Sequence, residues 1–356
     1  MFSVSIKKMP TCFNRIISIL FVAYAAIFLS AFTHHGSWMF TYAYDFNGPE
    51  QEYVAYWPGG MIEYEELDTR EEGLELEGRI PALTSYAGAV QLRVNPVIDQ
   101  VIEGKIADAR EIRARSLTFE FETYFSDPYM SIILKSTAAS ASSKTEVVSI
   151  NFNTNTGNLI TAADVVGSHV VQLADRLLVE MVRRNPTRYN PSFAGMREDQ
   201  AFSITDTEIT FWFNEFQLAP GFEGIVPLSL RLDSIKEITL TRFDYRVTGG
   251  FNLKMVPLRR TLEALGYQID WDPETHGTSV YHNDELIIKI MPNVNNYVRE
   301  SRFTRSLEAA PEIRNDNTYV PISFFDQILS LVAFSIDDQD NITFASYPVT
   351  DEWFDR

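Results

Sequence analysis

Cysteine is almost absent: the 356 residues include one, Cys12, and it precedes a long apolar run. The chain beyond that run therefore cannot form an internal disulfide, and its stability must come from packing. We interpret Cys12 as a thiol without a functional role. The pattern fits a protein that folds without disulfides.

Catalytic and metal-binding motifs are also missing. The five histidines show no His-Glu-x-x-His or other ligand spacing; they are His34, His35, His169, His276 and His282. The aspartates at 337, 338 and 340 lack the other ligands of a calcium loop and are typical of a hairpin turn. No Gly-x-Ser-x-Gly or glycine-rich phosphate motif occurs, and scattered carboxylates do not define a glycosidase pair. We therefore predict a non-enzyme without catalytic residues, metal or cofactor.

Basic residues are few compared with acidic ones. Lys and Arg number 30 against 48 Asp and Glu, which gives a formal net charge of -18. An acidic surface opposes the phosphate neutralisation on which nucleic-acid binding depends, so we predict no nucleic-acid partner. At 45% hydrophobic residues, the chain is long and apolar enough to form two or three packed domains.

The N-terminus carries an export signal. Lys7, Lys8 and Arg15 precede an uncharged apolar run at residues 16–32. Positive charge before such a run predicts an N-terminus held inside the cell and a following chain held outside. Because residues 29–31 form only a loose cleavage site, residues 1–33 are either a signal peptide or an uncleaved membrane anchor. The protein is accordingly expected at the cell surface, membrane-anchored or secreted.

Residues 34–73 are interpreted as an aromatic strand followed by an acidic linker. Aromatic residues alternate from 38 to 46, which predicts a strand with one apolar face; they are Trp38, Phe40, Tyr42, Tyr44 and Phe46. A strip on which glycans stack is the alternative. The strongly acidic residues 63–77 are typical of a solvated linker or exposed face.

Residues 74–247 show an α+β pattern. Apolar side chains alternate along three predicted strands; they are Leu117, Phe119 and Phe121, then Val148, Ile150 and Phe152, then Ile209, Phe211 and Phe213. From Ser168 the spacing becomes helical, and Arg183, Arg184 and Pro186 mark the end of that helix. The sequence predicts a central antiparallel sheet with packed helices.

Two motifs in this region resemble a known pair of domains. The first, N-F-x-x-x-T-G-x-L, covers residues 151–159 and is followed by Asp164; the second, F-x-x-F-x-L-A-P-G-F-x-G, covers residues 213–224. They resemble the extracellular domains of the lysozyme-sensing anti-sigma factor, DUF4163 and DUF3298, which also precede the catalytic domain of some peptidoglycan deacetylases. The resemblance implies a region that meets lysozyme or lies beside cell-wall chemistry.

The second motif contains the candidate site. Strand alternation predicts that Phe211 and Phe213 point into the core, and Pro220 with Gly221 turns the chain. Trp212 and Phe216 lie off that face. With Phe222, they are predicted to bind a partner.

Residues 248–348 contain an internal repeat, and residues 349–356 form a tail. The segment from Val256 to Leu258 recurs as Val320 to Ile322, and each copy is followed by a predicted short helix, strand, turn and strand. We predict a small α+β domain of two helix-strand-strand repeats. Over residues 252–347 it resembles the copper amine oxidase N-terminal-like domain, which is not the oxidase.

These patterns together predict a non-catalytic cell-envelope protein. Its expected partner is peptidoglycan or a wall-acting protein such as lysozyme, and its expected contact with the membrane is the N-terminal anchor. Two alternatives stay open: a transmembrane sensor of the anti-sigma type, and an accessory protein of a peptidoglycan-modifying enzyme.

Overall fold

The computed structural model describes residues 55–57, 60–85, 88–248, 252–299, 303–349 and 353. All of them belong to a unit that spans Glu52–Arg356. The predicted signal peptide or anchor and the predicted aromatic strand at residues 38–46 lie outside the described residues. No helix within the described ranges is both long enough and apolar enough to span a bilayer.

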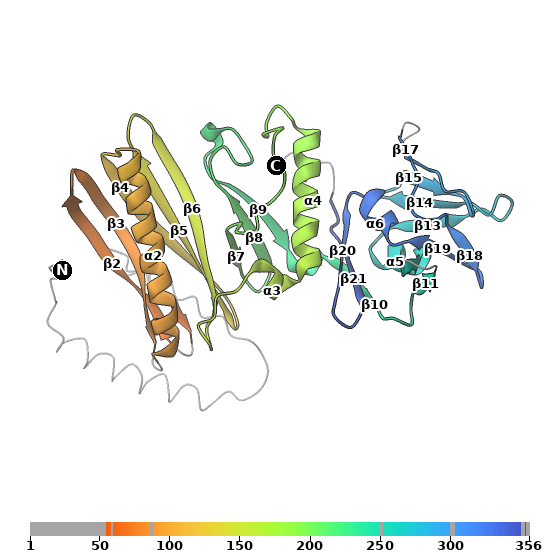
Figure 1. Cartoon of the computed structure of the whole chain (residues 1–356), viewed down its shortest axis with the longest axis horizontal. Helices are drawn as coiled ribbons and strands as arrows, with labels where there is room; N and C mark the ends of the chain where they lie inside the picture. Colours follow the sequence, from red (N-terminus) through yellow and green to blue (C-terminus); the bar gives the residue numbers. More distant parts are fainter. Residues whose placement is uncertain are drawn as a thin grey trace. The chain divides into compact units, whose positions relative to one another are not determined.

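A six-stranded sheet opens the described chain, with its strands in sequence order (Figure 1). The strands are β1 (Ala55–Trp57), β2 (Gly60–Glu71), β3 (Leu74–Ser85), β4 (Ser116–Ser126), β5 (Tyr129–Ala139) and β6 (Ser143–Asn153). Helix α2 (Ala89–Glu111) connects β3 to β4, which allows these two strands to run parallel, whereas the other neighbours are antiparallel. Four of its buried residues recur every four positions and pack on the sheet: Val90, Val94, Ile98 and Ile102.

The acidic stretch that was predicted to be a linker is instead part of this sheet. β2 pairs with β3 from Gly60 opposite Ser85 to Glu71 opposite Leu74. Glu63 and Glu65 are exposed on β2, while Ile62 is buried in the core. A strand with one solvated face tolerates such charge, because only the covered positions must be apolar.

A helical layer and a second sheet follow. Helix α4 (Ser168–Arg184) begins and ends as predicted, and it packs on a sheet of β7 (Phe202–Ile204), β8 (Glu208–Phe213) and β9 (Val226–Arg231). The short α3 (Ala162–Val166) precedes it. The Thr161 N–H donates to Asp164 Oδ2 at 2.8 Å and the Asp164 N–H to Thr161 Oγ1 at 3.3 Å. Asp164, next to the first motif, therefore completes a capping box.

A third sheet joins segments that are far apart in the sequence. Its order is β10 (Lys236–Leu240), β21 (Ile342–Ser346) and β20 (Val332–Ile336). Leu240 lies opposite Ile342, so this sheet includes residues from both sides of the predicted boundary at 247/248. Ala333 and Ala345 of this sheet share a core with α4.

Polar side chains of α4 also contact the C-terminal part of the chain. The guanidinium of Arg176 donates to the carbonyl oxygens of Phe325 at 3.3 Å and Leu329 at 3.4 Å, and it pairs with the carboxylate of Asp326. Earlier on the helix, His169 Nε2 lies 2.8 Å from Glu237 Oε1. These contacts fix α4 to the third sheet and to the following domain.

The predicted repeat has a direct structural counterpart. β12 (Leu253–Pro257) leads into α5 (Leu258–Ala264), and β19 (Asn317–Pro321) leads into α6 (Ser323–Gln327). The two strands pair antiparallel with Val256 opposite Val320, and both side chains are fully buried. Each helix is followed by two strands: β13 (Gln268–Trp271) and β14 (Thr278–His282) in the first copy, β20 and β21 in the second. The predicted α+β fold of two helix-strand-strand repeats is confirmed.

The remaining strands extend these repeats. β11 (Arg246–Thr248) and β18 (Glu312–Arg314) flank β12 and β19. β13 and β14 continue into β15 (Glu285–Ile290), β16 (Tyr297–Arg299) and β17 (Phe303–Arg305) to form a five-stranded sheet. The repeats enclose one apolar core, which includes Leu258, Leu262, Phe324 and Phe344.

Candidate functional site

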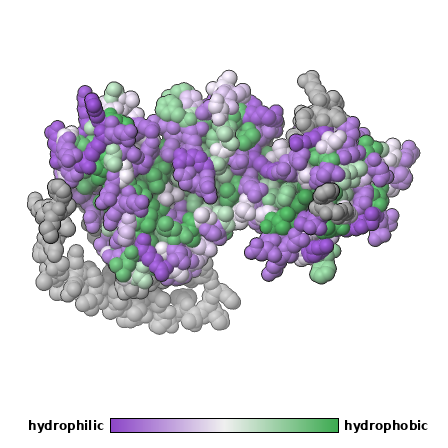
Figure 2. Space-filling model, viewed as in Figure 1, coloured by the Kyte–Doolittle hydropathy of each residue, from purple (hydrophilic) through white to green (hydrophobic). Residues whose placement is uncertain are grey.

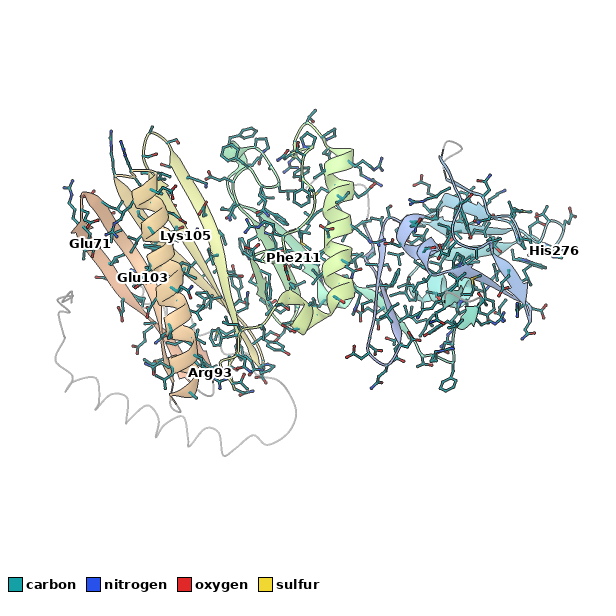
Figure 3. The ribbon with its side chains drawn as sticks, viewed as in Figure 1. Glu71, Arg93, Glu103, Lys105, Phe211 and His276 are labelled. Atoms are coloured by element: carbon teal, nitrogen blue, oxygen red, sulfur yellow. The ribbon has the colours of Figure 1, made fainter. Side chains whose placement is uncertain are left out.

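Strand β8 supports the predicted site with one apolar face. Ile209, Phe211 and Phe213 alternate along it and are buried in the core shared with α4. Figure 3 labels Phe211 beside this helix. The prediction that Phe211 and Phe213 point into the core is confirmed.

Trp212 lies on the other face of β8 and is half-buried. Its ring lies 6.3 Å from the ring of Tyr124, and Lys135 Nζ lies 5.7 Å from the ring centre. Trp212 Nε1 donates to Ser203 Oγ at 3.1 Å. The ring packs on a small core that includes Ile133 of the six-stranded sheet. Trp212 therefore holds two sheets together, and its exposed surface is limited.

The charges beside Trp212 are already paired. Glu122 accepts hydrogen bonds from Lys135 and from the hydroxyl of Tyr124, the latter at 2.6 Å. Burial opposes ionisation of Glu122, but these hydrogen bonds outweigh it and hold its pKa below the usual value. Burial and the bond to Glu122 raise the pKa of Tyr124 above its usual value. The negative charge of Glu122 is therefore balanced by the positive charge of Lys135 beside Trp212.

The loop at residues 214–224 is anchored on the edge of the six-stranded sheet. The Val147 N–H donates to Asn214 Oδ1 at 2.6 Å, and Asn214 Nδ2 donates to the Val147 carbonyl at 3.4 Å. The Thr145 N–H donates to Glu215 Oε1 at 3.1 Å. β6 is the edge strand of the sheet. The two side chains bond backbone groups of β6 that have no neighbouring strand to pair with.

Two of the predicted partner-binding residues lie at the tip of this loop. Phe216 is 65% exposed and Phe222 is 85% exposed. Phe216 has a left-handed backbone, with φ 63°, and a Cβ added to Gly221 would lie 2.2 Å from Phe216 Cζ. The glycine of the Ala-Pro-Gly turn therefore leaves room for the Phe216 ring. Figure 2 shows pale green residues at the tip of the β8–β9 loop.

An open apolar pocket of about 270 Å³ lies at the end of α4. It is lined by side chains of the helix and of the segment that follows it: Val179, Val182, Arg183, Pro186, Pro191 and Phe193. Phe193 packs edge-on against Phe213 at 5.9 Å, so the pocket floor is continuous with the core. This pocket was not predicted. The sequence offered one signal for this pocket: two prolines, Pro186 and Pro191, in the aromatic segment that follows the helix.

The loop and the pocket are neighbours. The Asn190 N–H donates to the Leu218 carbonyl at 2.8 Å, and Asn190 Nδ2 donates to the Phe216 carbonyl at 3.3 Å. Because Pro191 follows Asn190, the same short segment lines the pocket and supports the loop. Figure 1 shows the β8–β9 loop at the end of the sheet where α4 terminates.

A buried carboxylate organises the basic end of α4. Glu180 accepts hydrogen bonds from Arg183 at 2.6 Å and from Arg184 at 2.8 Å. Burial disfavours its charge, but the two arginines outweigh this and hold the pKa of Glu180 below the usual value. Arg183, on the rim of the pocket, is thus held in place.

The site is suited to binding an apolar or planar group. Phe216 and Phe222 provide exposed rings, the open pocket is lined mainly by apolar side chains, and Arg183 lies on its rim. The structure brings Phe216 and Phe222 together on one loop, whereas Trp212 contacts the six-stranded sheet. Among the described residues, no three or more His, Cys, Asp or Glu side chains are arranged to hold a metal ion.

One comparison with known proteins concerns the repeats. Residues 252–342 match the family described as Copper amine oxidase N-terminal domain, which confirms the predicted resemblance for this segment. A protein of Brevibacillus choshinensis named "Protease inhibitor" is 34% identical over 89 residues, or 25% of this chain. The match spans about a quarter, 27%, of that relative.

Two solved structures align with part of the chain at low similarity. One is a member of the DUF3298 family from Bacteroides fragilis, with a TM-score of 0.35 and 12% identity over 49% of this chain and 88% of the other. The second is a DUF3298 family protein from Pseudomonas aeruginosa, also with a TM-score of 0.35 and 12% identity, over 52% and 92%. The resemblance to the anti-sigma factor and the deacetylases stays a prediction.

Proposed function

We propose that this chain is a non-catalytic protein of the cell envelope that binds peptidoglycan or a wall-acting protein such as lysozyme. The observation that carries the proposal is the pair of exposed rings, Phe216 and Phe222, on an anchored loop beside an apolar pocket. Exposed aromatic rings next to a pocket are typical of binding surfaces, because large rings gain much from being covered. The N-terminal apolar run supports a location at the membrane.

The anchored loop reduces the conformational entropy that is lost when these rings bind a partner. Asn214 and Glu215 fix the start of the loop to β6, and Asn190 bonds the carbonyl of Phe216. A loop held in one conformation loses little conformational freedom when a partner covers it. Sugar rings of peptidoglycan and apolar side chains of a protein are both suited to stack on the phenylalanines.

A binding titration of the full chain tests this proposal. Peptidoglycan and lysozyme are each presented to the unmodified chain and to a Phe216→Ala/Phe222→Ala variant. We expect binding of at least one probe, weakened by at least about tenfold in the variant, which corresponds to about 1.4 kcal/mol. Phe243→Ala is the control, because Phe243 is 98% exposed but lies outside the site. Binding of neither probe, or equal binding by the double variant, contradicts the proposal.

The Brevibacillus relative favours a second candidate, in which the bound partner is a protease. Its printed name is "Protease inhibitor" and its identity to this chain is 34% over the matched residues. A residual-activity assay of trypsin and subtilisin with increasing full chain separates the two candidates. Stoichiometric inhibition favours the protease, and unchanged activity leaves the wall-directed candidate.

A further inference from the structure

The last turn of α4 and the segment after it form a cluster of arginines, which we call the arginine end of α4. Its members are Arg183, Arg184 and Arg188. The side chain of Arg183 is 63% exposed and that of Arg184 is 36% exposed. The guanidinium carbon of Arg188 lies 5.4 Å from the centre of the Tyr189 ring. These groups therefore present positive charge at the surface of a chain whose formal net charge is -18.

Two carboxylates in the described part of the chain act on this cluster. Glu180 accepts hydrogen bonds from the two arginines of α4 itself. Glu223 acts from the β8–β9 loop: burial raises the pKa of Tyr189, and the charges of Arg188 and Glu223 shift that pKa in opposite directions. Among the described residues, three arginines thus meet two carboxylates, so positive charge is in excess and favours a further anionic group.

Strand β21 leads the chain toward the arginine end of α4. On the neighbouring β20, Ser335 Oγ lies 3.1 Å from His169 Nδ1, at the start of the helix (Figure 1). The Val332 carbonyl, three residues earlier on β20, accepts a hydrogen bond from Arg176, two helical turns further on. β20 therefore runs against the direction of α4, and its antiparallel partner β21 runs with it. Ser346 of β21 is opposite Val332 and so lies near the level of Arg176.

The chain after β21 stays on the core that it shares with α4. Tyr347 and Val349 are buried in this core, and the Val349 carbonyl accepts a hydrogen bond from Asn283 Nδ2 at 2.8 Å. The ring of Trp353 lies 6.1 Å from the ring of Tyr347 and packs against the same core, which also contains Val182 of α4. Trp353 is thus held beside the core that the helix covers.

The lengths of helix and chain agree with this direction. From Arg176 to Arg184 the helix rises by about 12 Å, at about 1.5 Å per residue. About four extended residues after Ser346 span about 13 Å, at about 3.3 Å per residue. The residues that follow Val349 are therefore within reach of the arginine end of α4.

The tail of the chain combines negative charge with aromatic rings. Its residues from 351 to 355 are Asp351, Glu352, Trp353, Phe354 and Asp355. Carboxylates form strong, directional hydrogen bonds with guanidinium groups. A phenylalanine ring suits the apolar pocket on whose rim Arg183 lies, because two prolines and Phe193 line that pocket. The tail therefore matches the arginine end of α4 in charge and the pocket beside it in polarity.

We propose that the arginine end of α4 is a binding site for an acidic, aromatic peptide segment, and that residues 351–355 of the same chain occupy it. The carboxylates of Asp351, Glu352 and Asp355 pair with the arginines, and Phe354 covers the apolar pocket. The tail then competes with a partner for the pocket. This competition rests on the proposed function, whereas the peptide site does not.

The probe is a fluorescein-labelled peptide with the sequence of residues 350–356, titrated with the full chain and followed by fluorescence anisotropy. The unmodified chain is compared with a tail variant, Asp351→Asn/Glu352→Gln/Phe354→Ala/Asp355→Asn, in which the tail lacks the groups that bind. Trp353 is kept because it packs on the core. We expect the tail variant to bind the peptide at least about tenfold more tightly, because an attached tail competes at a high effective concentration.

Further changes to the tail variant test the arginines themselves. Adding Arg183→Met/Arg184→Met should weaken peptide binding by at least about tenfold, because charge-assisted hydrogen bonds are lost. Adding Arg197→Met should leave peptide binding unchanged, because Arg197 forms an exposed pair with Asp199 and does not line the pocket. A peptide with Asn and Gln in place of Asp and Glu should bind the tail variant at least about tenfold more weakly.

Thermal unfolding of each variant reports folding, and Arg188→Met replaces Arg183→Met/Arg184→Met if the loss of both partners of Glu180 unfolds the chain. The proposal is overturned if the peptide does not bind the tail variant, if it binds the tail variant and the unmodified chain equally, or if the folded arginine variants bind it unchanged. The assay contains neither peptidoglycan nor lysozyme, so its failure and the failure of the proposed function are separate results.

Discussion

The ring of Phe216 packs directly on the backbone of Gly221, where an added Cβ would lie 2.2 Å from Phe216 Cζ. Gly221→Ala must therefore displace this ring. Because the ring is 65% exposed and can move, we expect a modest loss of about 1 kcal/mol in the free energy of unfolding. In a Phe216→Ala background the same change should have almost no effect. Urea unfolding of the unmodified chain, the two single variants and the double variant measures the coupling, and equal losses in both backgrounds would show that the two residues do not interact.

Aromatic residues on β8 and on the loop after it should differ sharply in their effect on stability. Phe211→Ala removes a buried ring and should lower the free energy of unfolding by roughly 3 to 5 kcal/mol. Trp212→Ala should lower it by about 2 kcal/mol, because its ring is half-buried against Tyr124. Phe216→Ala should change it by less than about 0.5 kcal/mol. Denaturant midpoints rank the variants, and a Trp212→Ala variant as stable as Phe216→Ala would contradict the packing described for Trp212.

Trp212 also illustrates what the sequence could and could not predict. Alternation along β8 correctly separates Trp212 from Phe211 and Phe213, because side chains on a strand point to opposite faces in turn. It does not reveal what covers the second face. Tyr124 and Lys135, which do so, belong to strands more than 70 residues away in the chain. The prediction that Trp212 binds a partner therefore did not include this contact between sheets.

Local sequence patterns were sufficient to predict the fold where it depends on a single helix or on the internal repeat. The helical spacing from Ser168 predicts α4, and the repeated Val-Pro pairs predict two units whose valines, Val256 and Val320, face each other. Long-range pairings were not predictable in this way. The acidic residues around Glu63 and Glu65 suggested a linker, because their charge masks the alternation of apolar and polar residues that marks a strand. The pocket was not predictable because its floor depends on a contact between Phe193 and Phe213, which belong to different segments of the chain.

Arg176 should contribute more to stability than an exposed arginine. Its guanidinium donates to carbonyl oxygens near the end of α6 and pairs with Asp326, so Arg176→Met removes a donor from several acceptors at once. We expect a loss of about 2 kcal/mol in the free energy of unfolding. Arg197→Met is the matched control, because its pair with Asp199 is exposed on both sides and should matter by less than about 1 kcal/mol. Chemical denaturation measures both, and similar losses would contradict the role given to Arg176.

His282 should make the stability of the C-terminal domain depend on pH. Its ring lies 4.6 Å from the ring of Tyr267, and burial lowers the pKa of His282 more than the charge of Glu285 raises it. In the unfolded chain the pKa of histidine is about 6.5, so between the two pKa values the unfolded state binds more protons than the folded state. The contribution of neutral His282 is therefore complete above about pH 6.5 and is lost as the pH falls through the folded pKa.

His282→Gln removes this titration and should make the fall in stability between about pH 7.5 and pH 5 shallower than in the unmodified chain. His276→Gln, at an exposed position, is the control for loss of a histidine. Urea unfolding at several pH values gives the slope of unfolding free energy against pH for each protein. Equal slopes for the unmodified chain and His282→Gln would show that burial of His282 does not couple its protonation to folding, because linkage requires a difference in pKa between the two states.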